Sequence, residues 1–249
     1  MPRFFVEGII DPSASSLIIA GDDFHHIRDV LRLKPGDELT VCDGARIDLH
    51  CRLEKFIAGG VELAILACQP NQTEPPYQAV LYQGLAKGDK MDTIIQKAVE
   101  LGVSRIVPVQ CQRSVVRLDD HDTGKKLLRW NRIAAEAAKQ CGRGLVSIVN
   151  EPLSFADAVK EAAQADIRLL PWENERACSL RTWLEQLPPF PENPKISLLI
   201  GPEGGFSAAE AGLALKADIR PVTLGQRILR TETAGTVVLA MLVYRFNDF

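Results

Sequence analysis

The chain has 249 residues, of which 46% are hydrophobic and 24% are charged, and its formal net charge is −3. This composition excludes a disordered chain and a fibrous repeat, and the pI of about 5.9 argues against a general nucleic-acid binder. The length predicts one or two domains.

No segment of the sequence indicates a membrane or a metal. The longest uncharged stretch near the end, residues 233–244, is too short for a membrane-spanning helix. The first residues do not resemble a secretory signal, so we expect a cytoplasmic protein. The six cysteines are never closer than nine residues and the four histidines include one adjacent pair, so we expect reduced thiols and no metal site.

The first 70 residues carry strand and turn signals. With 7 basic and 11 acidic residues, this region is acidic. One short helix is expected at 23–33. The expected strands are 3–6, 16–20, 38–42, 47–56 and 61–68. Short strands at this spacing predict a small barrel or sandwich over residues 1–70, and the polar, proline-rich segment 71–77 is expected to be a linker.

From Gln78 onward, apolar runs alternate with helix-period stretches. The expected strands are 79–84, 105–109, 146–149, 167–170, 196–200 and 221–224. The expected helices are 89–101, 124–141, 155–163, 177–187, 208–216 and 233–246. Ser154 with Asp157 and Ser207 with Glu210 predict capping boxes. This alternation predicts a second domain, 78–249, built on a mainly parallel sheet with helices on both faces.

The loop after the expected strand 196–200 is the first candidate site. It reads Gly201-Pro202-Glu203-Gly204-Gly205-Phe206-Ser207. Glycines allow a close backbone approach to a ligand, and the following helix start offers free amides. The loop matches neither a P-loop nor Gly-x-Gly-x-x-Gly, which disfavours a kinase, a GTPase or an ordinary dinucleotide-binding dehydrogenase.

Two further strand ends complete the candidate region. Residues 224–234 carry Arg227, Arg230 and Glu232 before the apolar last helix, which Thr231 or Thr233 could cap. Residues 169–173 run from a strand into a turn. In open α/β sheets, ligands bind beyond the carboxyl ends of the strands, so we expect these loops to share one site.

These segments closely resemble the SPOUT, or α/β-knot, methyltransferases, specifically the bacterial family that methylates N3 of a uridine in 16S ribosomal RNA. The resemblance rests on residues 201–207 and 224–234 and extends through 87–91, 96–102, 113–115, Trp130, 136–138 and 141–143, and in the N-terminal region through 3–6, 25–26 and 30–37. Ala86, Cys141 and Gln226 depart from the common family pattern.

The resemblance implies a C-terminal parallel sheet with a deep trefoil knot and an N-terminal PUA-like β-barrel that engages RNA. It also implies a homodimer and bent S-adenosylmethionine bound mainly by main-chain groups of the knot loops. The implied cofactor-binding residues are Leu170, Pro171, Gly201, Glu203, Gly204, Gly205, Leu224, Gly225, Ile228, Leu229, Thr233 and Ala234.

Methyl transfer to N3 of uracil requires removal of a weakly acidic proton and stabilisation of charge on O2 and O4. An arginine can stabilise that charge, and Arg230 is the first candidate. Glu232 is expected to be the base or to orient the arginine, although compensation of charge at the helix terminus explains it equally well.

The RNA partner is expected to be 16S rRNA in the 30S subunit. Residues 84–145 carry 12 basic and 7 acidic residues, so a polyanion contact would be local. The expected RNA-binding residues are Arg3, His25, His26, Arg28, Arg32, Lys87, Lys90, Arg113, Arg117 and Arg143. A solvated charge is the alternative for each basic residue, and helix capping or packing for the two histidines.

Two other functions fit the sequence. One is a knotted methyltransferase that acts on tRNA or another ribosomal position, because local residues specify the cofactor more firmly than the target. The other is a non-catalytic RNA-binding assembly factor that retains the fold.

Overall fold

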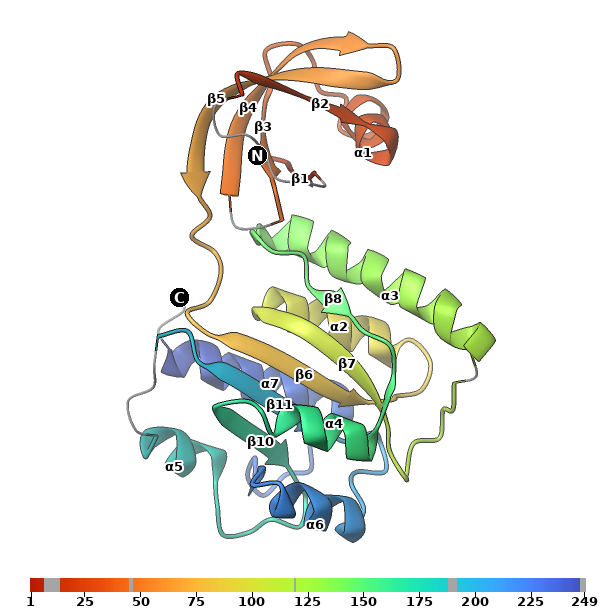
Figure 1. The fold of residues 1–249 in the computed structure, drawn as a ribbon, viewed down its shortest axis with the longest axis vertical. Coiled ribbons are helices and arrows are strands. Elements are labelled where there is room, and N and C mark those ends of the chain that lie inside the picture. The colour runs from red at the N-terminus through yellow and green to blue at the C-terminus, as the bar shows by residue number, and fades with distance from the viewer. Residues whose placement is uncertain (7–13, 45–46, 119, 188–191, 247–249) are drawn as a thin grey trace. The chain divides into compact units, whose positions relative to one another are not determined.

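The computed structural model describes residues 1–6, 14–44, 47–118, 120–187 and 192–246 (Figure 1). The chain divides into two compact units. The first contains Met1–Glu74 and Ala138–Val146, and the second contains Pro75–Ala137 and Ser147–Phe249. The expected linker at 71–77 is therefore divided between the units, and the assignment of 138–146 to the first unit had no signal in the sequence.

The N-terminal unit is built on one five-stranded sheet of order β1-β3-β4-β5-β2. Its strands are β1 (Arg3–Phe5), β2 (Ser16–Ala20), β3 (Glu38–Cys42), β4 (Ile47–Ile57) and β5 (Gly60–Pro70). β1 pairs with β3 in parallel, and the other neighbours are antiparallel. Among the described strands, β1 and β2 remain edges, so the sheet is an open, curled form of the PUA-like barrel.

Alternation along these strands builds the core of the N-terminal unit. Leu49, Cys51 and Leu53 on β4 and Val61 and Leu63 on β5 are wholly buried, because alternate side chains of a strand share one face. The helix expected over 23–33 is shorter and divided. An α-helical turn, α1 (Gly21–His25), continues into a wider π-helical turn, η1 (His26–Val30).

A buried ion network joins the ends of this unit. Arg143 Nη2 donates to Glu74 Oε2 over 2.7 Å, and both side chains are at most 5% exposed. The backbone N–H groups of Gly144 and Leu145 donate to Glu74 Oε1. Both carboxylate oxygens of Glu74 are therefore hydrogen-bonded, as a buried charge requires.

The C-terminal unit carries a sheet of order β12-β10-β11-β6-β7-β8, with β9 paired to β7. Every described pair is parallel, as the sequence predicts. The strands are β6 (Gln78–Gly84), β7 (Val103–Gln110), β8 (Ile148–Val149), β9 (Leu153–Ser154), β10 (Ile167–Pro171), β11 (Lys195–Ile200) and β12 (Arg220–Val222).

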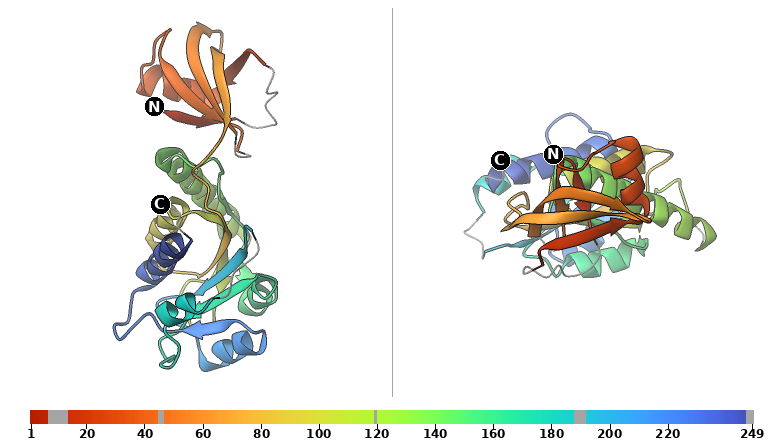
Figure 2. Two further views of the ribbon diagram at one scale, coloured as in Figure 1. Left: turned by 90° about the vertical axis from the view of Figure 1, so that its left-hand side faces the viewer. Right: turned by 90° about the horizontal axis from the view of Figure 1, so that it is seen from above.

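Helices cover both faces of this sheet. They are α2 (Lys90–Glu100), α3 (Asp120–Cys141), α4 (Phe155–Ala162), α5 (Leu180–Glu185), α6 (Ala208–Lys216) and α7 (Thr231–Arg245). α2 and α7 pack together on one face, and α4 and α6 lie on the other (Figure 2). β11 is buried at every position after its first residue, which is typical of a central parallel strand. None of the helices in the described ranges is long and apolar enough to cross a membrane.

Several boundaries differ from the sequence predictions. The helix expected at 177–187 begins only at Leu180, because the Ser179 side chain accepts the N–H of Thr182 and caps it there. The strand expected at 146–149 is limited to Ile148–Val149, and β9 was not predicted.

The two predicted capping boxes have different outcomes. Ser207 and Glu210 form a reciprocal box at the start of α6, as predicted. Ser154 caps α4 by accepting the Asp157 N–H, but its own hydroxyl, rather than its backbone N–H, bonds the Asp157 carboxylate. Ser154 is therefore a one-sided cap, because aspartate is shorter than the glutamate of the reciprocal motif.

Candidate cofactor pocket and catalytic site

A cavity of about 450 Å³ lies beyond the carboxyl ends of β10, β11 and β12. Its walls are the loops 171–176, 200–206 and 223–231, with Lys90 from the start of α2 and Ala234 from α7. The volume is within the usual range for a small-molecule site, and the position follows the rule for open α/β sheets. The three strand ends selected from the sequence therefore do share one site.

Close backbone contacts explain the glycines around the pocket. A Cβ on Gly84, the last residue of β6, would lie 2.5 Å from the backbone nitrogen of Pro202. Gly205 has φ +65°, and a Cβ there would lie 2.5 Å from a carboxylate oxygen of Glu173. Only glycine allows both this close packing and the left-handed conformation, so the loop after β11 is held tightly against β6 and Glu173.

A buried hydroxyl joins three segments at this place. Thr231 Oγ1 donates to the Gly201 carbonyl over 2.6 Å and accepts from Gln83 Nε2 over 2.9 Å. These bonds hold the start of α7 against the ends of β11 and β6. The expectation that Thr231 or Thr233 caps α7 was wrong, because Arg230 occupies the N-cap position and the Thr231 hydroxyl is used elsewhere.

Two carboxylates and one ammonium group meet at the edge of the pocket. Glu203 Oε1 accepts from the Lys87 N–H and from Lys90 Nζ, each over 3.0 Å. Lys90 Nζ also lies 3.7 Å from Glu232 Oε2. Burial acts to raise the pKa of Glu203, but the hydrogen bonds from the Lys87 N–H and the Lys90 ammonium outweigh it and lower the pKa.

Most of the residues expected to bind the cofactor line this pocket. They are Pro171, Gly201, Glu203, Gly204, Gly205, Leu224, Gly225, Ile228, Leu229 and Ala234. Leu170 does not line it, because its side chain is wholly buried in the core between the sheet and α4. Thr233 also lies outside the wall, exposed on the first turn of α7. Neither residue lines the cavity, so their contact with the cofactor stays a prediction.

The structure adds residues that the sequence did not assign to the pocket. Trp172, Glu173 and Arg176 contribute from the loop after β10. Trp172 and Glu173 belong to the turn 169–173 of the candidate region, but the sequence assigned neither of them to the cofactor. Lys90 was assigned to RNA, but its side chain is engaged with Glu203.

The pocket suits a small molecule that has polar groups and charges of both signs. Trp172 Nε1 and Glu232 Oε2 are buried and have no hydrogen-bond partner in the described part of the chain. Gly201, Gly204 and Gly205 leave a wall without side chains, and Ile228, 85% exposed, offers apolar surface. Glu173 and Glu203 line the pocket together with Lys90, Arg176, Arg227 and Arg230, so its wall carries charges of both signs. Such a wall suits S-adenosylmethionine, which has a sulfonium, an amino group and a carboxylate. No group of three or more potential metal ligands occurs among the described residues.

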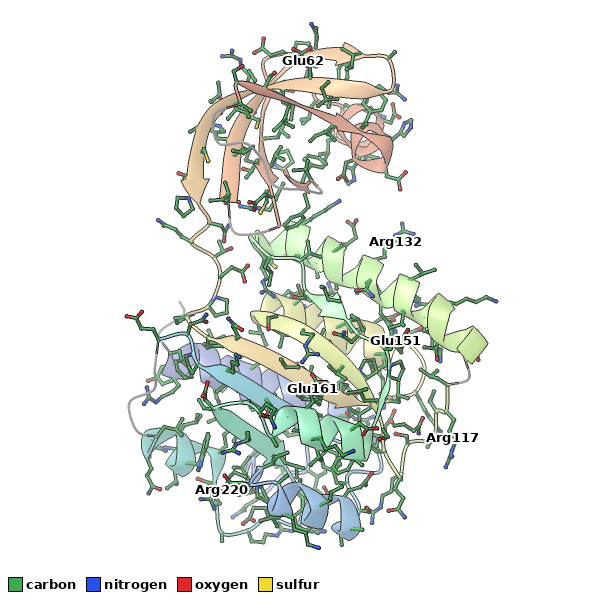
Figure 3. All side chains as sticks on the ribbon, viewed as in Figure 1. Glu62, Arg117, Arg132, Glu151, Glu161 and Arg220 are labelled. Carbon is green, nitrogen blue, oxygen red and sulfur yellow. The ribbon has the colours of Figure 1, made fainter. Side chains whose placement is uncertain are left out.

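The predicted RNA-binding residues divide into two sets. His25, His26, Arg28 and Arg32 are exposed on α1, η1 and the turn after them, and Lys87, Arg113 and Arg117 are exposed in the C-terminal unit (Figure 3 shows Arg117). Arg3 and Arg143 are not exposed in the same way. Arg3 forms an ion pair with Asp48 and Arg143 with Glu74, so both guanidinium groups are engaged within the protein.

Comparison with known proteins defines the class. Residues 73–243 match the RNA methyltransferase domain family, and residues 19–66 match the RNA methyltransferase PUA domain family. The chain is thus an RNA methyltransferase with a PUA domain.

Individual relatives define the family more narrowly. Ribosomal RNA small subunit methyltransferase E of Bacillus subtilis is 32% identical over 98% of this chain and 97% of its own length. The enzyme of the same name from Neisseria gonorrhoeae, solved bound to S-adenosyl methionine, superposes with a TM-score of 0.86 at 32% identity, covering 98% of this chain and 97% of that one. A putative methyltransferase of Legionella pneumophila in complex with SAM gives 0.84 at 31% identity, covering 97% and 96%. The chain belongs to the ribosomal RNA small subunit methyltransferase E family.

Proposed function

We propose that this chain transfers the methyl group of S-adenosylmethionine to N3 of a uridine in 16S ribosomal RNA. The observation that carries this proposal is the pocket edge, where the exposed Arg230 and the carboxylate of Glu232 stand two residues apart beside a cavity of about 450 Å³. A cation and a carboxylate at one opening are what N-methylation of a weakly acidic imide requires. The family and its SAM-bound relatives support the proposal.

The cofactor supplies an electrophilic methyl group on a sulfonium. Residues 201–205 and 224–229 would hold it largely through main-chain groups, with Trp172 Nε1 free to donate a hydrogen bond. The Glu232 carboxylate would accept the N3 proton of uracil, and Arg230 would stabilise the charge on O2 and O4. The N3 electron pair then forms the new bond to carbon as the bond from sulfur to carbon breaks.

The target base must leave its stack to reach the pocket, which costs a few kcal/mol for a paired base. We infer that exposed basic residues on both units hold the RNA backbone while this happens. They are Arg28 and Arg32 in the N-terminal unit and Lys87, Arg113 and Arg117 in the C-terminal unit. The assembled 30S subunit, in the cytoplasm, is the proposed substrate.

We also propose that the enzyme is a homodimer. An apolar groove of about 570 Å³ lies on α5 and α7, lined by Leu184, Val237, Ala240 and Met241 and by Tyr244, which is 77% exposed. An apolar surface of this kind on the last helix suits a second copy of the chain. Sedimentation equilibrium of wild type and Met241→Glu tests this, because a wild-type monomer at micromolar concentration would contradict it.

The activity is tested with methyl-labelled S-adenosylmethionine and three substrates: purified 30S subunits, free 16S rRNA and bulk tRNA. We expect label in 16S rRNA, recovered as N3-methyluridine after nuclease digestion. Label only in tRNA or on another nucleoside would support a related methyltransferase. Calorimetry that detects no binding at millimolar cofactor would support a non-catalytic assembly factor.

A further inference from the structure

Lys90 occupies the first position of α2, and its ammonium group lies between two carboxylates of the pocket. Nζ is 3.0 Å from Glu203 Oε1 and 3.7 Å from Glu232 Oε2. All three side chains are between 24% and 32% exposed. Lys90 is therefore directed into the pocket and is not a free arm for a phosphate group.

Glu232 Oε2 has an unusual environment. The atom is buried and accepts no hydrogen bond from the described residues. A buried carboxylate oxygen without a hydrogen bond is costly unless a cation lies close to it. Lys90 is the cation found within 4 Å of Glu232 in the described ranges, so it balances the charge while leaving the lone pairs of Oε2 free.

Glu203 holds Lys90 in this position. Its Oε1 accepts from both the Lys90 ammonium and the Lys87 N–H, so one carboxylate oxygen fixes the turn before α2 and the side chain at the start of the helix. Glu203 itself belongs to the glycine-rich loop that forms the cofactor wall. The loop that would hold the cofactor is thereby joined through Lys90 to the first turn of α7.

We propose that Lys90 is a positioning residue for the methyl-transfer step: held by Glu203, it keeps the Glu232 carboxylate at the pocket edge, where that carboxylate accepts the uracil N3 proton. This inference rests on the proposed function, in which that proton moves to Glu232 and the N3 electron pair forms the bond to the methyl carbon. Lys90 from α2 lies 3.7 Å from Glu232, and Glu203 from the loop after β11 and Arg227 and Arg230 from the segment before α7 line the neighbouring cavity.

The first test compares Lys90→Gln and Lys90→Arg in single-turnover methylation of 30S subunits. We expect K90Q to lower the rate about 10-fold or more, because loss of the ammonium group between Glu203 and Glu232 releases the position of the Glu232 carboxylate. K90R keeps a cation at this place and should recover most of the wild-type rate. Lys97→Gln is the matched control, since Lys97 lies on the same helix and pairs with Glu100.

Cofactor binding separates positioning from a general defect. Calorimetry should give a dissociation constant for S-adenosylmethionine in K90Q within about threefold of wild type, so that the loss is in the transfer step. Thermal unfolding of each variant controls for folding. An unchanged single-turnover rate in a folded K90Q would overturn the proposal, as would a loss of rate fully explained by weaker cofactor binding.

The second test is a double-mutant cycle with Glu232→Gln. If Lys90 acts through Glu232, K90Q has no further effect on the rate once Glu232 is replaced. A full additional loss in the double variant would show that Lys90 acts independently, which contradicts the inference but leaves the activity intact. A wild-type rate in E232Q would instead overturn both the role of Glu232 as base and the role of Lys90. Absence of N3-methyluridine with the wild-type enzyme marks failure of the proposed function itself.

Discussion

The pocket of the C-terminal unit and the ion network of the N-terminal unit use similar residues in opposite ways. In the network, Glu74 accepts four hydrogen bonds, from Arg143 and from two backbone N–H groups, and is almost wholly buried. In the pocket, Glu232 Oε2 accepts none from the described residues, and Arg230 is exposed. Satisfied charges stabilise a fold, whereas unsatisfied charges beside a cavity remain available for chemistry.

The largest expected effect is on the stability of the network. Glu74→Ala removes the buried carboxylate that accepts from Arg143 and from two backbone N–H groups, so we expect a loss of about 3–5 kcal/mol in the free energy of unfolding. Urea denaturation measures it. The control is Glu185→Ala, which removes the exposed pair with Arg181 and should cost less than about 1 kcal/mol. Equal, small effects would show that the network is not a stabilising feature.

The second effect is on catalysis and should leave stability unchanged. Arg230→Ala should lower the single-turnover methylation rate about 100-fold, equivalent to about 2.7 kcal/mol, because it removes the group that stabilises the developing charge. Arg220→Ala, at an exposed position of β12 (Figure 3), is the control. A rate within a few-fold of wild type for R230A would assign Arg230 to the solvated surface.

The third effect compares two helix caps. Ser207→Ala and Ser154→Ala each remove an N-cap and should each cost about 1 kcal/mol of stability. Only S207A should also weaken S-adenosylmethionine binding in calorimetry, because Ser207 directly follows the glycine-rich loop of the pocket. Equal cofactor affinity in both variants would show that the loop does not depend on its cap.

A smaller effect concerns the exposed arginines of the N-terminal unit. Combined Arg28→Glu and Arg32→Glu should weaken binding to 30S subunits and reduce the slope of log affinity against log salt by about 1 to 2. Filter binding at salt concentrations from about 50 to about 200 mM measures this slope. Arg28 pairs with Asp29 at the surface, where both side chains are exposed. An unchanged slope would exclude Arg28 and Arg32 from the RNA contact.

The last effect disappears in acid. Burial acts to raise the pKa of Asp48, but hydrogen bonds from Arg3 and Asn71 outweigh it, so the pKa lies below its usual value of 3.8. Stability from this carboxylate is fully present above pH 3.8 and is lost as the pH falls through the lowered pKa. The free energy of unfolding, measured by circular dichroism, should therefore differ between wild type and Asp48→Asn above pH 3.8, and the difference should shrink as the pH falls from 3.8 through the lowered pKa. A constant difference down to the lowest pH would contradict this.

The sequence predicted which loops form the pocket, but it did not predict which basic residues are exposed. The loops 201–207 and 224–234 follow strands of a parallel sheet, and topology alone brings such strand ends together. The position of a basic residue in the sequence does not show whether its side chain is exposed. Arg143 and Arg28 look equivalent in the sequence, but Arg143 is buried because Glu74, 69 positions away, accepts its guanidinium.

Long-range contacts also explain what the sequence missed in the site. Lys90 lies 113 positions from Glu203 and was assigned to RNA because only its charge was visible. Thr231 was expected to cap α7, but its hydroxyl bonds Gly201 and Gln83, which no local pattern indicates. The open, curled form of the N-terminal sheet depends on which strands pair, and strand signals alone do not determine pairing.

The most direct test of the account is mass spectrometry of 16S rRNA from a strain in which the gene has been deleted and then restored. We expect N3-methyluridine at one position in the parent, its absence in the deletion strain, its return with the wild-type gene and a strong reduction with E232Q. Retention of that modification in the deletion strain, or loss of a different modification, would contradict the assignment of this chain as a uridine N3-methyltransferase of 16S rRNA.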